Sequence, residues 1–211
     1  MINIITPKLS FSGGTSLRYD TKYIVLHHAE AQSCTVEQVH QWHLSNGWVG
    51  IGYHYFVRKD GGVYRGRPEN TIGAHCTNYN SVSIGICAEG AYHDKDSVMP
   101  GVQKRAIIEL IADIGNRYKG LKIVGHRDLM ATSCPGKHYP FEEIVKGEIK
   151  EEVEEMIYNY IDKNMPEWAR PTIQKLVDKG LLKGDENGEL GLNDTMLKIF
   201  AVNDRAGLYD K

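Results

Sequence analysis

The sequence has few prolines and no low-complexity segment, features that would indicate a disordered or fibrous protein. Its 211 residues include only 7 prolines and 4 phenylalanines, and no segment is of low complexity. Hydrophobic residues make up 41% and charged residues 25% of the chain, which is typical of a folded protein rather than a disordered or fibrous one. A chain of this length can form one domain of roughly 100–150 residues with a small second unit.

Long apolar runs and clusters of positive charge are also missing. No segment approaches the ~20 consecutive apolar residues of a membrane-spanning helix. Residues 1–20 lack the basic start and uninterrupted apolar stretch of a secretory signal peptide, so we expect synthesis in the cytoplasm. Lysine and arginine do not gather in a run, which argues against a nucleic-acid partner.

Cysteine is scarce and its spacing is uninformative for disulfides, because no CxxC pair occurs. The four cysteines are Cys34, Cys76, Cys87 and Cys134. This usage favours reduced thiols or metal ligands, although two disulfides stay open for a protein that works outside the cell. All nine histidines and all four cysteines lie within residues 1–147, and residues 148–211 are acidic. Metal chemistry is therefore expected in a domain formed by 1–147, with 148–211 as a second unit.

Residues 1–147 alternate between strand and helix patterns. The expected strands are 23–26, 53–59, 63–66, 83–88 and 121–124, and the expected helices are 36–46 and 102–118. Thr35 and Gln38 form a capping box ahead of the first helix. The order of elements predicts an α/β fold, a mixed central β-sheet flanked by helices, in which the helical crossovers require some parallel strands.

Residues 148–211 are expected to form a small helical C-terminal domain. The pattern indicates a linking helix over 149–163, a helix between Pro166 and Gly180, a turn at 184–188 and a last helix over 193–200. Acidic residues in the turn suggest a calcium loop, but the EF-hand pattern is incomplete and a turn is the preferred interpretation.

Three side chains fit a catalytic zinc site, in which three protein ligands leave one position open. His27 and His126 each follow an expected strand, and Cys134 lies in the loop after His126. Because the chain has nine histidines, spacing alone also allows other sets of three metal ligands. Because successive strand residues face opposite sides, only one of His27 and His28 can point at a shared metal.

Five short motifs occur in order along the chain. They are Tyr23-Ile-Val-Leu-His-His28, Gly52-Tyr-His-Tyr-Phe56, Gly73-Ala-His75, Asn80 with Ser83-Ile-Gly-Ile86, and Gly125-His-Arg-Asp128 before Thr132-Ser-Cys-Pro-Gly136. Together they resemble the N-acetylmuramoyl-L-alanine amidase type 2 family, which includes phage amidases and is similar to the peptidoglycan recognition proteins. The resemblance spans roughly residues 20–140.

The resemblance implies a zinc cofactor, Zn²⁺, held by His27, His126 and Cys134. It places Tyr53 beside the metal, where its hydroxyl can orient water or the tetrahedral intermediate. Thr132 stands where phage relatives often carry lysine, and a hydroxyl can donate a hydrogen bond but adds no positive charge.

Four further residues are candidates for substrate binding. His75 and Asn80 match positions that line the substrate groove in the family, and Arg65 and Arg67 follow the expected hairpin, where they can meet a stem-peptide carboxylate. For all four, an ordinary polar role is a competing interpretation.

The function implied is zinc-dependent hydrolysis of the amide between N-acetylmuramic acid and L-alanine in bacterial peptidoglycan. A missing export signal favours a phage or prophage endolysin that acts on the cell wall after release. The alternatives are a non-catalytic recognition protein, which typically lacks the cysteine ligand, and a host autolysin or recycling amidase. Residues 148–211 are interpreted as a wall-binding module with a loose likeness to S-layer homology helices, or as a brace or arm for a homodimer.

Overall fold

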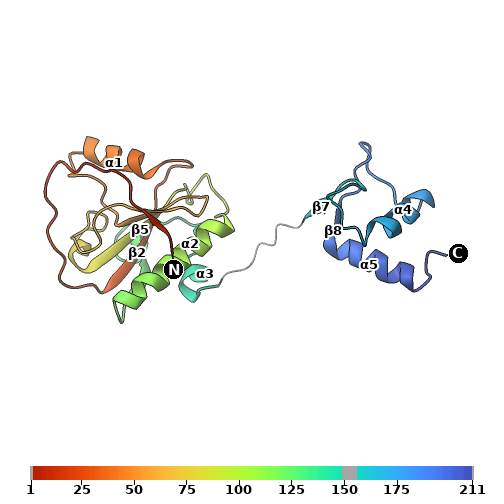
Figure 1. The fold of residues 1–211 in the computed structure, drawn as a ribbon. Coiled ribbons are helices and arrows are strands. Elements are labelled where there is room, and N and C mark those ends of the chain that lie inside the picture. The colour runs from red at the N-terminus through yellow and green to blue at the C-terminus, as the bar shows by residue number, and fades with distance from the viewer. Residues whose placement is uncertain (1, 149–155, 211) are drawn as a thin grey trace. The chain divides into compact units, whose positions relative to one another are not determined.

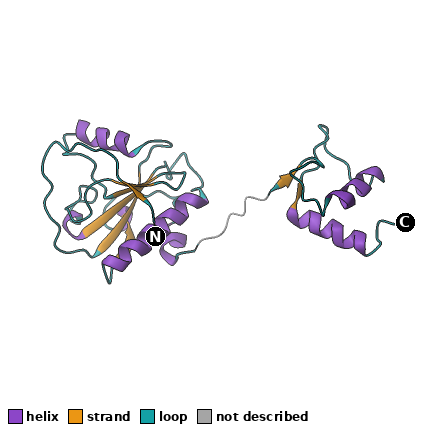
Figure 2. Cartoon of the chain, viewed as in Figure 1, coloured by secondary structure: helices purple, strands orange, loops and turns teal. Residues whose placement is uncertain are grey.

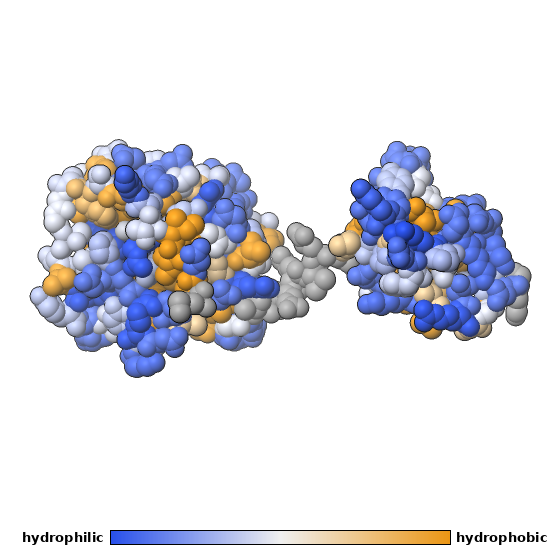
Figure 3. Space-filling view, in the orientation of Figure 1, coloured by the Kyte–Doolittle hydropathy of each residue, from blue (hydrophilic) through white to orange (hydrophobic). Residues whose placement is uncertain are grey.

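The computed structural model describes residues 2–148 and 156–210 (Figure 1). The chain divides into two compact units, Met1–Glu151 and Glu152–Lys211, called here the N-terminal and C-terminal units. Buried hydrophobic residues form two clusters in the first unit and one in the second, with no residue in common between the units. Each unit therefore has a hydrophobic core of its own. On the face of each unit seen in Figure 3, hydrophilic residues cover much of the surface, with hydrophobic patches between them.

The N-terminal unit is built on a six-stranded sheet with the strand order β1-β4-β3-β5-β2-β6. Figure 2 shows strands of this sheet in orange with helices beside them. Its elements are β1 (Ile4–Ile5), β2 (Tyr23–His28), α1 (Val36–Ser45), β3 (Tyr55–Val57), β4 (Val63–Arg65), the 3-10 helix η1 (Asn80–Val82), β5 (Ser83–Ala88), α2 (Gly101–Arg117), β6 (Lys122–Gly125), the 3-10 helix η2 (His126–Asp128) and α3 (Phe141–Lys146). Strand β2 runs parallel to β5 and β6, and β3 parallel to β5, whereas the β3–β4 hairpin is antiparallel. The predicted mixed α/β sheet is confirmed.

Successive side chains along each strand point to opposite faces of this sheet. On one face, Ile24, Leu26 and Ile86 pack in the same cluster as Ile107 of α2 and Ile144 of α3. On the other face, Phe56 and Cys87 pack with Val36 and Val39 of α1. The sheet is thus covered by α2 and α3 on one side and by α1 on the other, and His27 belongs to the α1 side because it alternates with Leu26.

Most predicted elements of this unit occur within a residue or two of their expected bounds, and the Thr35–Gln38 capping box is present. Strand β1 and helix α3 were not predicted. Helix α3 carries ordinary boundary signals, since it follows Pro140 and ends at Gly147 with φ +69°. Strand β1 has two residues, which is too short to show alternation.

The C-terminal unit contains β7 (Ile157–Tyr158), α4 (Arg170–Asp178), β8 (Leu192–Asn193) and α5 (Asp194–Arg205). Helices α4 and α5 correspond to two of the predicted helices, and the short antiparallel pair of β7 and β8 was not predicted. Part of the expected 149–163 helix lies outside the described residues, and its described part, 156–163, is not helical. No helix in the described ranges is long and apolar enough to cross a membrane.

The predicted turn at 184–188 is present. The Asp185 carboxylate accepts hydrogen bonds from the backbone N–H groups of Asn187 and Glu189, each at 2.9 Å, and Gly188 takes a φ of +80°. Asp185 therefore closes the turn on itself, as an aspartate at a turn commonly does.

Candidate metal centre

Parallel pairing of β2 and β6 brings two histidines together at one end of the sheet. Leu26 pairs with Gly125 in the register, so the next residues, His27 and His126, lie beside each other with ring centroids 4.6 Å apart. The following loop returns Cys134 to the same place. The ligand atoms of these three residues lie within 4.8 Å of one another, and no other described histidine, cysteine or acidic residues form such a group.

Hydrogen bonds of Arg127 and Asp128 hold the returning loop. The Arg127 N–H donates to the Cys134 carbonyl at 2.8 Å, and its guanidinium donates to the Gly136 carbonyl at 3.0 Å. The Asp128 carboxylate accepts from the Gly125 N–H at 2.7 Å, which closes the turn after β6. His126 and Cys134 are therefore positioned by the same short segment.

The donor set and its spacing fit a tetrahedral zinc ion. His27 Nδ1 lies 3.7 Å from Cys134 Sγ. With zinc bonds of about 2.1 Å to nitrogen and about 2.3 Å to sulfur, tetrahedral geometry separates two such ligand atoms by roughly 3.6 Å. Two imidazoles and one thiol also leave a fourth position open, as catalytic zinc sites do.

A chain of hydrogen bonds fixes the protonation of His27. Ser83 donates its hydroxyl proton to the Tyr79 carbonyl at 2.7 Å, so its oxygen can accept from His75 Nε2, 3.4 Å away. His75 Nδ1 is then unprotonated and accepts from His27 Nε2 at 3.0 Å. This assignment leaves the lone pair of His27 Nδ1 directed toward Cys134 and free to bind a metal.

Burial keeps these groups uncharged in the protein without metal. Burial lowers the pKa of His27 well below its usual value, with a further contribution from His126, and it does the same for His75, assisted by His27. Burial also raises the pKa of the Cys134 thiol to about 12, which a hydrogen bond from the His28 backbone partly opposes. A bound cation would be needed to favour the thiolate here.

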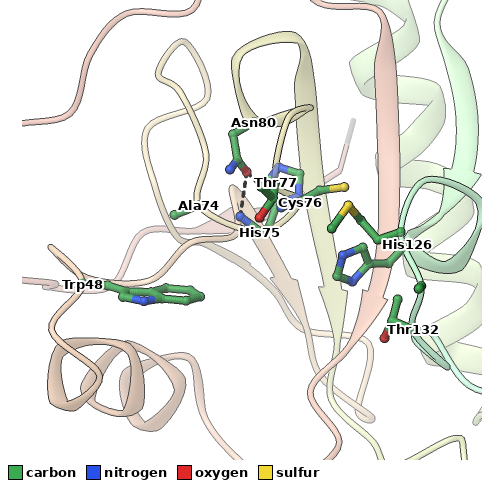
Figure 4. A pocket seen from close by; sticks show the side chains of 10 residues that line it. Trp48, Ala74, His75, Cys76, Thr77, Asn80, His126 and Thr132 are labelled. Carbon is green, nitrogen blue, oxygen red and sulfur yellow. Dashed lines mark hydrogen bonds between the residues drawn. The ribbon is translucent and has the colours of Figure 1, made fainter.

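A cavity of about 370 Å³ opens beside the histidines (Figure 4). Its lining includes His126 and Thr132 on one side, His75 and Asn80 on a second, and Trp48 opposite them. The Asn80 side-chain oxygen accepts from the N–H groups of His75 and Cys76 at 2.8 and 2.9 Å, so Asn80 also holds this wall in place.

Tyr53 and Thr132 each lie beside one of the three ligands. The Tyr53 ring lies 5.0 Å from the His27 ring, and its hydroxyl hydrogen-bonds with the Cys87 thiol. Burial raises the pKa of Tyr53 well above its usual value, so the phenol stays protonated. The Thr132 hydroxyl accepts from the Cys134 N–H at 3.2 Å, which leaves its own proton free to be donated.

The structure does not bring Arg65 and Arg67 to this cavity. Arg67 is 5% exposed and donates to the backbone carbonyls of Ile51 and Ile72 at 3.1 and 2.9 Å. Arg65 lies over the Tyr55 ring at 5.7 Å and lines a different cavity. Arg67 therefore holds loops together, and a stem-peptide role for either arginine has no support from its position.

Trp48 and Met130 line the cavity and were not singled out in the sequence. Cys87 is the register partner of His27 and contacts Tyr53. His28 faces away from the three ligands, with its Nδ1 accepting from the Tyr92 N–H at 3.0 Å. Alternation predicted that His27 and His28 face opposite sides, and the family resemblance indicated which of the two is the ligand.

The comparison with known families agrees with this geometry. Residues 17–137 match the family model described as N-acetylmuramoyl-L-alanine amidase. The chain belongs to the N-acetylmuramoyl-L-alanine amidase family. All three proposed ligands and the walls of the cavity lie within the matched residues.

The relatives of the chain include phage endolysins and peptidoglycan-recognition proteins. The chain is 31% identical to an endolysin of Klebsiella phage KP32 over 124 residues, 56% of this chain and 82% of the relative. It is 34% identical to peptidoglycan-recognition protein SC2 of Drosophila melanogaster over 139 residues, 60% of this chain and 74% of the relative. Among solved structures it is similar to the N-acetylmuramoyl-L-alanine amidase LysC from Clostridium intestinale, with a TM-score of 0.67 and 33% identity over 70% of this chain and 97% of that one.

Proposed function

We propose that the protein is a zinc-dependent hydrolase of the amide bond between N-acetylmuramic acid and L-alanine in bacterial peptidoglycan. The observation that carries this proposal is the grouping of His27, His126 and Cys134 beside a cavity in a chain of the amidase family. Recognition proteins without activity typically lack the cysteine ligand. The presence of Cys134 therefore favours an enzyme over a binding protein.

The ligands and their neighbours have separate tasks in this reaction. Zinc held by the three ligands would polarise the scissile carbonyl and lower the pKa of a bound water toward about 7. The Tyr53 phenol and the Thr132 hydroxyl each offer an O–H that can stabilise the oxyanion of the tetrahedral intermediate. The hydrogen bond from His27 to His75 keeps the His27 ring in one tautomer and orientation throughout.

We propose a phage or prophage endolysin as the biological role, made in the cytoplasm and acting on the wall once released. The likeness to a phage endolysin supports this proposal. For the C-terminal unit we propose adsorption to the cell wall, with a brace or an arm for a homodimer as the alternative. Its separate hydrophobic core is what an independent binding module requires.

Hydrolysis of purified peptidoglycan tests the proposed activity. The native protein is expected to release new N-terminal alanine without new reducing sugar ends, and a chelator or Cys134→Ser should abolish the release. Ser133→Ala, next to the ligand and exposed, is the matched control. Reducing ends without alanine would indicate a glycosidase, and wall binding by the zinc-loaded protein with no release at all would leave a recognition protein.

A further inference from the structure

A second cavity, of about 330 Å³, lies on the α2 side of the sheet and is lined by Ile4, Tyr55, Arg65, Glu69 and Arg117. Tyr55 packs in the same cluster as Ile107 of α2, whereas His27 lies on the α1 side. Arg65 is the antiparallel register partner of Tyr55, and partners in such a register point to the same face. This cavity is therefore separate from the one beside the metal ligands.

The one acidic residue that lines this cavity, Glu69, is already paired. The Tyr55 hydroxyl donates to its carboxylate, and Arg117 donates to it from Nε and Nη2 at 3.1 and 2.8 Å. Burial raises the pKa of Glu69, but the hydrogen bonds from Arg117 and Tyr55 outweigh burial and keep the pKa below its usual value of 4.5. Glu69 is thus ionised at neutral pH, and Arg117 balances its charge.

The guanidinium of Arg65 has no such partner. It lies over the Tyr55 ring, 5.7 Å from the ring centroid, and makes no hydrogen bond or ion pair with any residue in the ranges 2–148 and 156–210. All five of its N–H groups are therefore available to a ligand.

Two further guanidinium groups add positive charge near Arg65. Arg117 uses four of its five N–H groups, two on Glu69 and two on the carbonyl and carboxylate of Asp113, so one N–H on Nη2 remains. Arg18 lies within electrostatic range of Glu69 and Tyr55, and its hydrogen bonds go to neutral groups such as the Thr71 carbonyl at 2.9 Å. This surplus of guanidinium groups favours an added negative charge.

An unpaired guanidinium in a concave site suits an oxyanion, because its planar N–H groups match the oxygens of phosphate and carboxylate. The donors here come from two directions, since Arg65 projects from β4 and Arg117 from α2. A phosphate group can accept from both at once, because it has more oxygens than the two of a carboxylate.

We propose that Arg65, assisted by Arg117, binds a phosphate group in this cavity, either free or as part of a phosphodiester polymer. The site goes beyond the proposed amidase function. Because it lies on the α2 side, it can be filled while the cavity beside the metal ligands is also occupied.

Two-dimensional NMR of the zinc-loaded, full-length protein tests the site, with the arginine Nε–H signals as local reporters. Inorganic phosphate is expected to shift the Arg65 and Arg117 signals with one shared midpoint. Arg65→Gln should raise the dissociation constant by about tenfold or more, because charged hydrogen bonds are lost. Arg65→Lys, which keeps the charge but not the planar fork, should lie between the two.

The control variant is Arg105→Gln. Arg105 is exposed on α2 and does not line the cavity, so this variant loses the same charge and should bind phosphate as the native protein does. Ionic strength is held constant with sodium chloride, because salt screens contacts between exposed charges.

Two other probes identify the form of the ligand. Poly(glycerol phosphate) with a lower midpoint per phosphate than inorganic phosphate supports a phosphodiester polymer, and the reverse order supports a free phosphate group. Acetate is expected to need a concentration about tenfold higher than phosphate, since a carboxylate engages fewer of the donors.

Three results would each overturn the site: shifts confined to residues around the metal ligands, equal midpoints for phosphate and acetate, or an Arg65→Gln protein that binds phosphate as tightly as the native one. None of these measurements depends on hydrolysis. The amidase proposal and the phosphate site are therefore tested separately.

Discussion

His27 depends on residues that never touch a metal. Its Nε2 bonds to His75, and His75 bonds to Ser83, whose own proton is committed to the Tyr79 carbonyl. Such outer partners set the tautomer of a ligating imidazole, and losing one typically weakens metal binding by about 10–100-fold. His75 was singled out in the sequence as a groove residue, and its 8% exposure is compatible with a wall of the cavity as well as with this relay.

We expect Ser83→Ala to weaken zinc binding by about tenfold or more, because the His75 ring loses the acceptor that holds its proton on Nε2. Zinc affinity is measured by competition with a chromophoric chelator. Ser81→Ala is the control, since Ser81 is exposed in the same segment. Equal zinc affinities for the two variants would show that the relay does not position His27.

Residue-level prediction rested on alternation and on the family resemblance, and neither gives tertiary contacts. The resemblance indicated His27 as the ligand, and alternation along β2 implied that His28 faces the opposite side. Neither could reveal that Ser83 lies behind His75, because that contact joins a loop to β5. Arg67 was expected to meet a stem-peptide carboxylate, but it donates to backbone carbonyls of two separate loops that only the fold brings together.

At the scale of elements, Glu89 links the end of β5 to two other segments. Its carboxylate accepts from the Cys34 N–H at 2.9 Å, just ahead of α1, and from the Lys59 N–H at 2.8 Å in the β3–β4 hairpin. Arg58 adds an ion pair at 3.2 Å. Burial alone would raise the pKa of Glu89, but these hydrogen bonds and Arg58 outweigh it and hold the pKa below its usual value of 4.5.

We expect Glu89→Gln to lower the free energy of unfolding by roughly 2–3 kcal/mol at neutral pH, because charged hydrogen bonds to buried donors are lost. A carboxyl with a depressed folded-state pKa stabilises the protein above its unfolded pKa, and this contribution disappears as the pH falls through the folded value. The difference between native and variant should therefore be constant from pH 7 to about 4.5 and shrink below that.

Urea unfolding of both proteins across this pH range measures the difference. Glu109→Gln is the control, since Glu109 is exposed on α2. A difference that grows with acidity, or a Glu109→Gln protein as unstable as Glu89→Gln, would contradict the role given to Glu89.

Element prediction from the sequence worked best for long periodic segments. Helix α2 and strand β5 were expected within a residue of their bounds because seventeen-residue and six-residue patterns show a period clearly. Strands β7 and β8 have two residues each and show none. Their pairing arises from a contact between segments more than thirty residues apart, which no local pattern encodes.

At the scale of the whole molecule, the two units carry separate cores. Tyr158, Met165, Ile173 and Leu197 belong to the cluster of the C-terminal unit, and none of the described core residues of the sheet joins it. The family match ends at residue 137, before this unit begins. The boundary between the units was expected because all histidines and cysteines lie within residues 1–147. The sequence of the second unit contains no comparable set of residues from which its function could be predicted.

We expect a chain ending at residue 148 to keep its zinc content, its thermal transition and its rate on a soluble muropeptide, because the core of the N-terminal unit is complete without the rest. If residues 149–211 adsorb to the wall, sedimentation with whole cell walls should fall. Loss of the thermal transition, or of a dimer measured by light scattering, would favour a brace or dimer arm instead.

The central claim is that this chain hydrolyses one amide bond. The most direct test is to find which product takes up the oxygen atom of the attacking water. A purified disaccharide tetrapeptide is digested in ¹⁸O-enriched water and the products are analysed by mass spectrometry. The account predicts one heavy oxygen in the lactyl carboxylate of the disaccharide and a tetrapeptide with a free alanine amine and no label. Label at a sugar carbon, label within the peptide, or recovery of intact substrate with zinc-loaded protein would contradict it.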